Sequence, residues 1–188
     1  MARISRNSIM ADVQGMIGNQ IVYKKRKGKP YTCAPPEVNK NRKPGEKEQA
    51  NRNRFKNSTH YAKHAVKDAA IKSNYAAVAK EWQTAYNVAF QDASYGPEVS
   101  GIITKSYAGE IGDVIFIQAK DNFKVIKVYV SIYDGNNDLV EKGEAVDNGD
   151  GLNWIYTVTQ LNKNVPASKI IVTAYDLPYN EAMMEVIV

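Results

Sequence analysis

The stretch "KVIKVYVSIYD", residues 124–134, places an aliphatic residue at every second position from Ile126 to Ile132. Successive side chains of a β-strand point to opposite faces, so a period of two predicts a strand with one buried face. Four more runs have this character: residues 113–121, 153–160, 169–176 and 182–188. The C-terminal half of the chain is therefore predicted to be built from β-strands.

Turn-forming residues separate these runs. They are Asp121-Asn122, "DGNND" (134–138), "DNGDG" (147–151) and Asp176-Leu177-Pro178. Asp, Asn, Gly and Pro favour turns because they tolerate or fix the backbone angles that turns need. Six or seven short strands in about 90 residues predict a β-sandwich of the immunoglobulin type. Trp154, within an apolar run, is expected in its core.

The pattern changes at "SYGPEVSG", residues 94–101, where Gly96 and Pro97 stop a helix and favour extended backbone. We expect a domain boundary here. Residues 1–95 would form a basic module with a β-hairpin and a two-helix hairpin, and residues 96–188 the immunoglobulin-like sandwich. The expected fold class is α+β.

Two helices are predicted before this boundary. Residues 46–70 carry apolar side chains at three- and four-residue spacing, with Glu46 and Glu48 complementing the dipole of the first turn. Residues 74–93 form the second helix, with Ser73 as its N-cap. Its stripe is expected to be core, with a base-stacking platform as the alternative: Tyr75, Val78, Trp82, Tyr86 and Phe90.

Residues 19–34, "NQIVYKKRKGKPYTCA", predict two strands joined at Lys27-Gly28, because Gly28 can supply the positive φ of a tight turn. Gly15 and Gly18 indicate a second tight turn or a close backbone contact just before them. The single cysteine, Cys33, excludes an internal disulfide and is interpreted as a small strand residue.

Two groups of residues carry a resemblance. In the first, Gly15, Gly18, Asn19, Tyr23, Gly28, Lys29 and Tyr31 approximate a "GxxGNxxxYxxxGKxY" hairpin, and Gln49, Arg52 and Phe55 approximate "QxxxRxxF". With these motifs, the chain as a whole resembles a family of uncharacterised bacterial and phage-borne proteins. In the second group, residues 119–145, 151–159 and 170–180 resemble immunoglobulin-like modules of bacterial surface and phage proteins. The resemblance implies the two-part architecture and no particular activity.

Charge is divided unevenly along the chain, although the net charge is only +5. Residues 1–95 contain 18 Lys and Arg against 7 Asp and Glu, whereas residues 96–188 contain 7 against 13. Such asymmetry favours either a polyanionic partner or a complementary protein surface. The residues expected to bind a partner or a polyanion are Lys24, Lys25, Arg26, Lys27, Lys29, Lys40, Arg42, Lys43, Arg52 and Arg54.

We expect a non-enzymatic structural or assembly subunit, virion-like or filament-like. Its basic N-terminal arm would contact other subunits in a homo-oligomer or polymer, because unlike charges at the two ends favour head-to-tail contacts. The alternative is a nucleic-acid-binding protein of low sequence specificity, in which the hairpin contacts phosphates and Tyr23 and Tyr31 stack on bases. A third reading is a sandwich that captures a glycan or a protein.

No arrangement of residues predicts catalysis, a cofactor or a small-molecule substrate. "GMIGN" lacks the lysine of a phosphate-binding loop, and no Ser, Cys or carboxylate stands with a base in a recognisable motif. His60 and His64 are four residues apart on one helix face, but "HYAKH" lacks the glutamate of a zinc protease. We therefore expect two solvated histidines and no metal site.

The Asp- and Asn-rich turns leave one alternative open. "DNGDG" lacks the spacing of a calcium loop, so ordinary turns are the preferred interpretation. A weaker hypothesis has Asp121, Asn122, Asp176 and Asn180 meeting at one end of the sandwich to coordinate an ion.

The chain shows neither a secretory signal nor a membrane span. Residues 1–15 have two arginines but no apolar core, and no window of about 18 uninterrupted apolar residues occurs. We expect synthesis in the cytoplasm, with a virion or an extracellular assembly left open as the final location.

Overall fold

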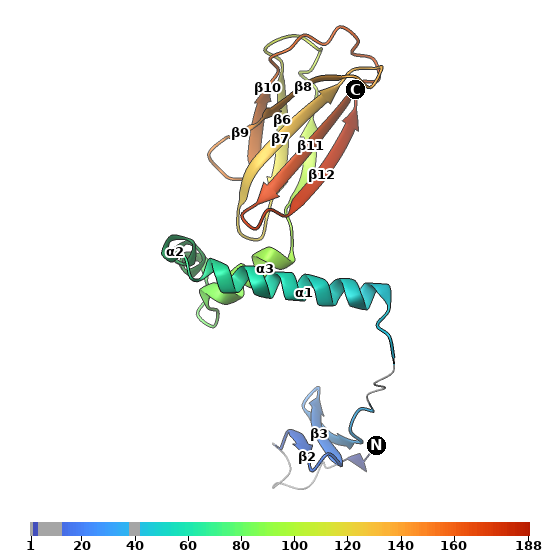
Figure 1. The fold of residues 1–188 in the computed structure, drawn as a ribbon, viewed down its shortest axis with the longest axis vertical. Coiled ribbons are helices and arrows are strands. Elements are labelled where there is room, and N and C mark those ends of the chain that lie inside the picture. The colour runs from blue at the N-terminus through green and yellow to red at the C-terminus, as the bar shows by residue number, and fades with distance from the viewer. Residues whose placement is uncertain (1, 4–12, 38–41) are drawn as a thin grey trace. The chain divides into compact units, whose positions relative to one another are not determined.

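The computed structural model describes residues 2–3, 13–37 and 42–188 (Figure 1). It consists of two compact units, residues 1–45 and residues 46–188. The class is mixed α+β, and the three helices among the described residues lie in the second unit. Among the described residues, no helix has both the length and the apolar character needed to cross a bilayer.

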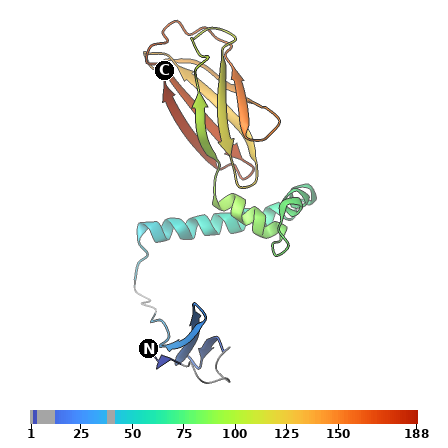
Figure 2. The ribbon, with the colours of Figure 1, turned by 180° about the vertical axis from the view of Figure 1, so that it is seen from behind.

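The second unit contains two four-stranded antiparallel sheets, which we call the two-sheet region. The first has the order β5-β6-β10-β9, and its strands are Glu98–Ile103, Val114–Lys120, Asn153–Thr157 and Val146–Asp147. The second has the order β12-β11-β7-β8, and its strands are Glu181–Ile187, Lys169–Asp176, Val125–Tyr133 and Leu139–Glu144. Strands β5 (yellow-green) and β12 (dark red) lie side by side in Figure 2.

All five runs with a period of two contain an observed strand. Their inward side chains form one core to which both sheets contribute, as Ile117 of β6, Val130 of β7 and Val172 of β11 show, each with no exposed surface. Trp154 is 5% exposed and belongs to the same core. Burial alternates strictly along β6, β10 and β11, which explains why a period of two appears in their sequences.

Three helices precede these sheets, where the sequence predicted two. They are α1 Glu46–Ala65, α2 Ala69–Val78 and α3 Ala85–Ser94. The predicted second helix is therefore wrong in its extent. It is interrupted after Val78 and restarts at Thr84, whose hydroxyl oxygen accepts a hydrogen bond from the Asn87 amide at 3.3 Å.

The predicted N-cap of the second helix is also wrong. Asp68 caps α2, because its Oδ1 accepts hydrogen bonds from the amides of Ala70 and Ile71 at 2.9 and 3.0 Å. Ser73 lies inside the helix. An aspartate that accepts hydrogen bonds from two otherwise unpaired amides of the first turn is a stronger helix-start signal than Ser73.

The predicted core stripe is divided by this interruption. Tyr75 is fully buried, and Phe90 is partly buried against the helical core. Val78 and Trp82, in contrast, are 56% and 74% exposed. The chain leaves the helical path between them, so the 3.6-residue spacing no longer places them on one face.

The N-terminal unit contains one antiparallel sheet, the N-terminal sheet, in the order β1-β4-β3-β2. Its strands are Ala2–Arg3, Lys29–Cys33, Ile21–Arg26 and Gly15–Ile17. Strands β3 and β4 are joined at Lys27 and Gly28, whose φ angles are 50° and 75°. Two consecutive positive φ angles are those of a type I′ turn, whose twist matches that of the flanking strands.

The boundary between the two units falls after Gly45 in the chain, whereas the sequence predicted a domain boundary near residue 95. The change from helix to strand does occur there, since α3 ends at Ser94 and β5 begins at Glu98. Phe123 and Leu177 of the two-sheet region pack against the buried residues of the helices. This packing joins the helices and the sheets in one compact unit.

Candidate functional site

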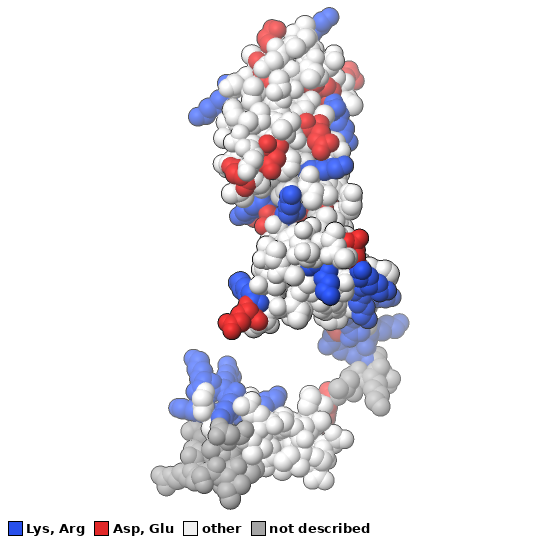
Figure 3. All heavy atoms as spheres, turned by 90° about the vertical axis from the view of Figure 1, so that its left-hand side faces the viewer, with Lys and Arg blue, Asp and Glu red and all other residues white. Residues whose placement is uncertain are grey.

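The tip of the β3–β4 hairpin is strongly cationic. Its five basic residues are all exposed, and they gather at one end of the N-terminal sheet in Figure 3: Lys24, Lys25, Arg26, Lys27 and Lys29. Lys24 pairs with Tyr31 and Arg26 pairs with Lys29 across the strands. Directly paired residues share a face of a sheet, so Lys24, Arg26 and Lys29 form a basic surface on the face that carries Tyr31.

The two tyrosines proposed as stacking residues lie on opposite faces of this sheet. Tyr23 pairs with Thr32, whereas Tyr31 pairs with Lys24, the neighbour of Tyr23 in the chain. Because adjacent residues of a strand point to opposite sides, the two rings do not form a common platform. Each is partly buried.

The N-terminal sheet has few buried apolar side chains. Val22, at 8% exposure, is the single buried hydrophobic residue among the described residues of this unit. Met16, Ile17 and Ile21 are 54%, 57% and 43% exposed. Ile17 pairs with Ile21, and both share a face with Tyr23. This face is therefore an apolar surface open to solvent.

The other basic residues singled out from the sequence are dispersed. Lys40 lies outside the described residues, and Arg42 and Lys43 are exposed just before α1. Arg52 forms an ion pair with Glu48 at 2.7 Å on the surface of α1. Arg54 donates a hydrogen bond to Asn51 at 3.2 Å, and its guanidinium lies 5.8 Å from the ring centroid of Tyr95.

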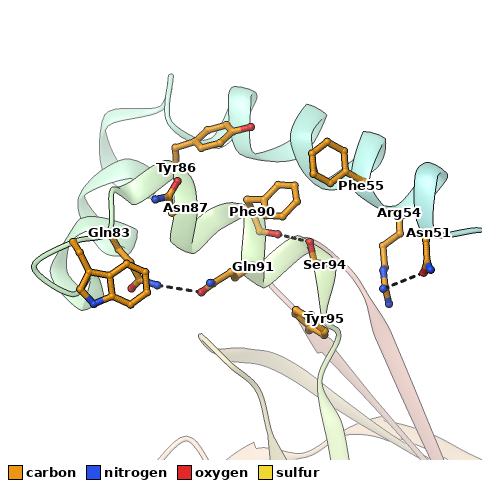
Figure 4. Close-up of a pocket in the computed structure, with 11 residues that line it drawn as sticks. Asn51, Arg54, Phe55, Gln83, Tyr86, Asn87, Phe90, Gln91, Ser94 and Tyr95 are labelled. Carbon is orange, nitrogen blue, oxygen red and sulfur yellow. Dashed lines mark hydrogen bonds between the residues drawn. The ribbon is translucent and has the colours of Figure 1, made fainter. Parts of the chain in front are cut away.

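An aromatic groove runs between α1 and α3 (Figure 4). Its volume is about 620 Å³. Phe55 and Phe90 both line it, with ring centroids 5.2 Å apart in an edge-to-face arrangement. Trp82 and Tyr95 are exposed at its margins. Sequence reasoning missed the groove, since it assigned Trp82, Tyr86 and Phe90 to a core stripe.

A chain of buried hydroxyl and carboxyl groups links the helices. The hydroxyls of Tyr61 and Tyr75 are 2.9 Å apart, and Tyr75 donates to Asp92 Oδ2 at 2.5 Å. Burial raises the pKa of Asp92 to about 8 and raises the pKa of the Tyr75 hydroxyl. These bonds join two tyrosines and one carboxyl group, and no Ser, Thr, Cys or His takes part in them.

The structure also brings together some of the turn residues considered as ion ligands. Carboxylate oxygens of Asp92, Asp121 and Asp176 all lie within 4.8 Å of one another, and we call these residues the carboxylate cluster. Asn180 donates to Asp176 from its amide and its side chain, at 2.6 and 2.7 Å. Asn122 instead donates to the Gln91 carbonyl at 3.1 Å. Asp92 was missed because it stands on a helix.

The other residues considered as metal ligands are the two histidines of α1 and the aspartates of the "DNGDG" turn. The exposed rings of His60 and His64 lie next to each other in a tilted arrangement, with centroids 4.6 Å apart. Within the described part of the chain, no carboxylate or thiol joins them as a third ligand. In the "DNGDG" turn, Asp147 and Asp150 accept hydrogen bonds from backbone amides, as in ordinary turns between strands.

Comparison with known proteins supplies no family and no activity. No protein-family model and no curated protein matches the chain. Among solved structures, it aligns with an engineered protein from a structural genomics consortium at 13% sequence identity and a TM-score of 0.32. The alignment covers 53% of this chain and 21% of that protein.

Proposed function

We propose that this protein is a non-enzymatic structural subunit whose N-terminal sheet makes contacts between copies of the chain. The supporting observation is the small core of that sheet, where Val22 alone is buried among the described hydrophobic residues. A unit of about 40 residues rarely buries enough surface to be stable by itself. Covering the face that exposes Ile17 and Ile21 with another copy would supply the missing burial.

The distribution of charge supports a contact between unlike surfaces. Residues 1–45 contain ten Lys and Arg against two Asp and Glu, whereas residues 96–188 carry a net charge of −6. A basic surface on one copy and an acidic surface on the next attract each other and disfavour contact between like ends. Contacts of this head-to-tail kind propagate into rings or filaments.

The two-sheet region fits this role as an outward-facing or spacing module. We propose that it is an immunoglobulin-like β-sandwich, supported by two antiparallel sheets on one core and by buried Trp154. We also propose membership of the bacterial and phage-borne family that the chain resembles, in which a virion-like or filament-like assembly would be the setting.

Light scattering on the nuclease-treated full chain, over a dilution series, tests the assembly. We expect large particles that dissociate on dilution. The double variant Ile17→Ser/Ile21→Ser should leave monomers, because it removes the apolar surface of the N-terminal sheet. The control Leu139→Ser/Val146→Ser changes two exposed aliphatic residues of the two-sheet region and should assemble like the wild type. Monomeric wild-type protein at high concentration would refute the proposal.

A second candidate function, nucleic-acid binding, is supported by the basic surface of Lys24, Arg26 and Lys29. Each phosphate neutralised contributes about 0.9 to the slope of log affinity against log salt. The variant Lys24→Gln/Arg26→Gln should therefore reduce that slope by about 2, and Lys105→Gln/Lys163→Gln should not. Binding that does not change with salt would exclude this function.

A further inference from the structure

The carboxylate cluster joins three elements that are distant in the sequence. Asp92 lies in α3, Asp121 directly follows β6, and Asp176 is the last residue of β11. Asp92 and Asp176 have no exposed surface, and Asp121 is partly buried. The cluster therefore lies where the helices meet the strand ends of the two-sheet region, with Asp121 nearest to solvent.

Two carboxylate oxygens in the cluster have no partner. Asp92 Oδ2 accepts the hydrogen bond of Tyr75, but the fully buried Asp92 Oδ1 accepts none. Asp121 Oδ2 accepts bonds from the amides of Phe123 and Lys124, both at 3.1 Å, and its buried Oδ1 accepts none. Each carboxylate is thus held in orientation by one oxygen, while the other is left available to a ligand.

The cluster also lacks a positive charge. In the part of the chain that the structure describes, no Lys, Arg or His forms an ion pair with any of the three carboxylates. An uncompensated buried charge is strongly unfavourable. A bound cation would supply the charge that the protein does not.

We propose that Asp92, Asp121 and Asp176 bind a hard divalent cation of the Ca²⁺ class, which fastens α3 to the strand ends of the two-sheet region. All three donors are oxygen atoms, the ligands that Ca²⁺ and Mg²⁺ prefer. Ca²⁺ binds oxygen at about 2.3–2.6 Å, so carboxylate oxygens that all lie within 4.8 Å of one another can share one ion. Mg²⁺ demands a stricter octahedral geometry and keeps several waters, so a largely buried set of three carboxylates fits Ca²⁺ better.

Neighbouring contacts hold the carboxylates of this site in position and link the elements around it. Asn180 holds Asp176 through two hydrogen bonds and donates a third to the Asp92 carbonyl at 3.4 Å. The ring of Phe123 lies 4.5 Å from that of Tyr75, which itself donates to Asp92. These contacts already link α2, α3 and the strand ends, so the cation would join elements whose positions are set. Water reaching the partly exposed Asp121 would complete its coordination.

Calcium titration of the EDTA-treated full chain tests the proposal, followed by calorimetry and by the melting temperature. We expect saturable binding of one Ca²⁺ per chain. At 100-fold excess over Kd, the melting temperature should rise by about 5–10 °C. Asp121→Asn should abolish both responses, whereas Asp138→Asn, in an exposed turn between β7 and β8, should retain them. Mg²⁺ at the same concentration should produce a smaller shift.

A proton shared between Asp92 and Asp121 is the competing explanation of the cluster. It predicts that Ca²⁺, Mg²⁺ and Mn²⁺ at millimolar concentration leave the wild-type melting temperature unchanged. It also predicts that Asp121→Asn, which keeps the shape and removes a charge, stabilises the chain without any metal. Either absence of a wild-type metal response or an undiminished response in Asp121→Asn would overturn the cation site. Because the first readout uses the wild type, a variant that does not fold leaves the test intact.

Discussion

The N-terminal sheet and the two-sheet region are both antiparallel β-structure, but they are stabilised differently. In the two-sheet region, each sheet covers the other, and side chains such as Ile117 and Val130 lose all contact with solvent. The N-terminal sheet has no second layer among the described residues of its unit, and Ile17 and Ile21 stay about half exposed. Strand pairing alone forms a sheet, whereas a second layer gives it a core.

The largest effect that separates the two regions should come from truncating one isoleucine in each. Ile117→Ala removes a fully buried side chain and should lower the free energy of unfolding by about 2–5 kcal/mol. Ile21→Ala removes a side chain that is 43% exposed and should change it by less than about 0.5 kcal/mol in the monomer. Urea denaturation of both variants at low protein concentration gives the comparison. Equal losses would mean that the N-terminal sheet has a core of its own.

An intermediate effect is expected for two tyrosine hydroxyls. Tyr75→Phe removes the hydrogen bond to buried Asp92 Oδ2 and should cost about 1–3 kcal/mol, since a buried acceptor is left unpaired. Tyr31→Phe, in the N-terminal sheet, removes the hydroxyl of a partly buried ring and should leave the free energy of unfolding nearly unchanged. Thermal unfolding in EDTA measures both without interference from metal. A neutral Tyr75→Phe would show that Asp92 finds another donor.

In the third and smallest predicted effect, the substitution in the N-terminal sheet is the costly one, because this sheet depends on its turn. Gly28 has φ +75°, so Gly28→Ala should cost about 1–2 kcal/mol of local stability although no atom lies near the added methyl. Gly45→Ala, where neither a positive φ nor a close atom occurs, should be neutral or slightly stabilising. Hydrogen exchange of the β3 and β4 amides resolves this difference. Unchanged exchange in Gly28→Ala would show that strand pairing tolerates another turn.

Secondary structure could be predicted from the sequence wherever a single residue or a single hydrophobic period decides it. The five strand runs and the Lys27-Gly28 turn are of this kind. The division of residues 74–93 into two helical pieces was not predicted, because Val78, Trp82 and Phe90 keep a helical spacing across the interruption. There the caps at Asp68 and Thr84 outweigh the periodicity.

Which residues share a face of the β3–β4 hairpin also could not be predicted from the sequence. The sequence offered Tyr23 and Tyr31 as residues that stack on bases, and strand register places them on opposite faces of the sheet. Register depends on the position of the turn, and a shift of one residue exchanges the two faces. The face that Lys24 shares with Arg26 and Lys29 could therefore be assigned only when the pairing was known.

By itself, the sequence determined where strands form, where the hairpin turns and how charge divides along the chain, because each depends on neighbouring residues. Tertiary structure alone decided that Asp92 meets Asp121 and Asp176, and that the helices belong with the two sheets. Those residues are dozens of positions apart and belong to different elements, so no local pattern links them. Only the packing of α3 against the ends of β6 and β11 brings their carboxylates together.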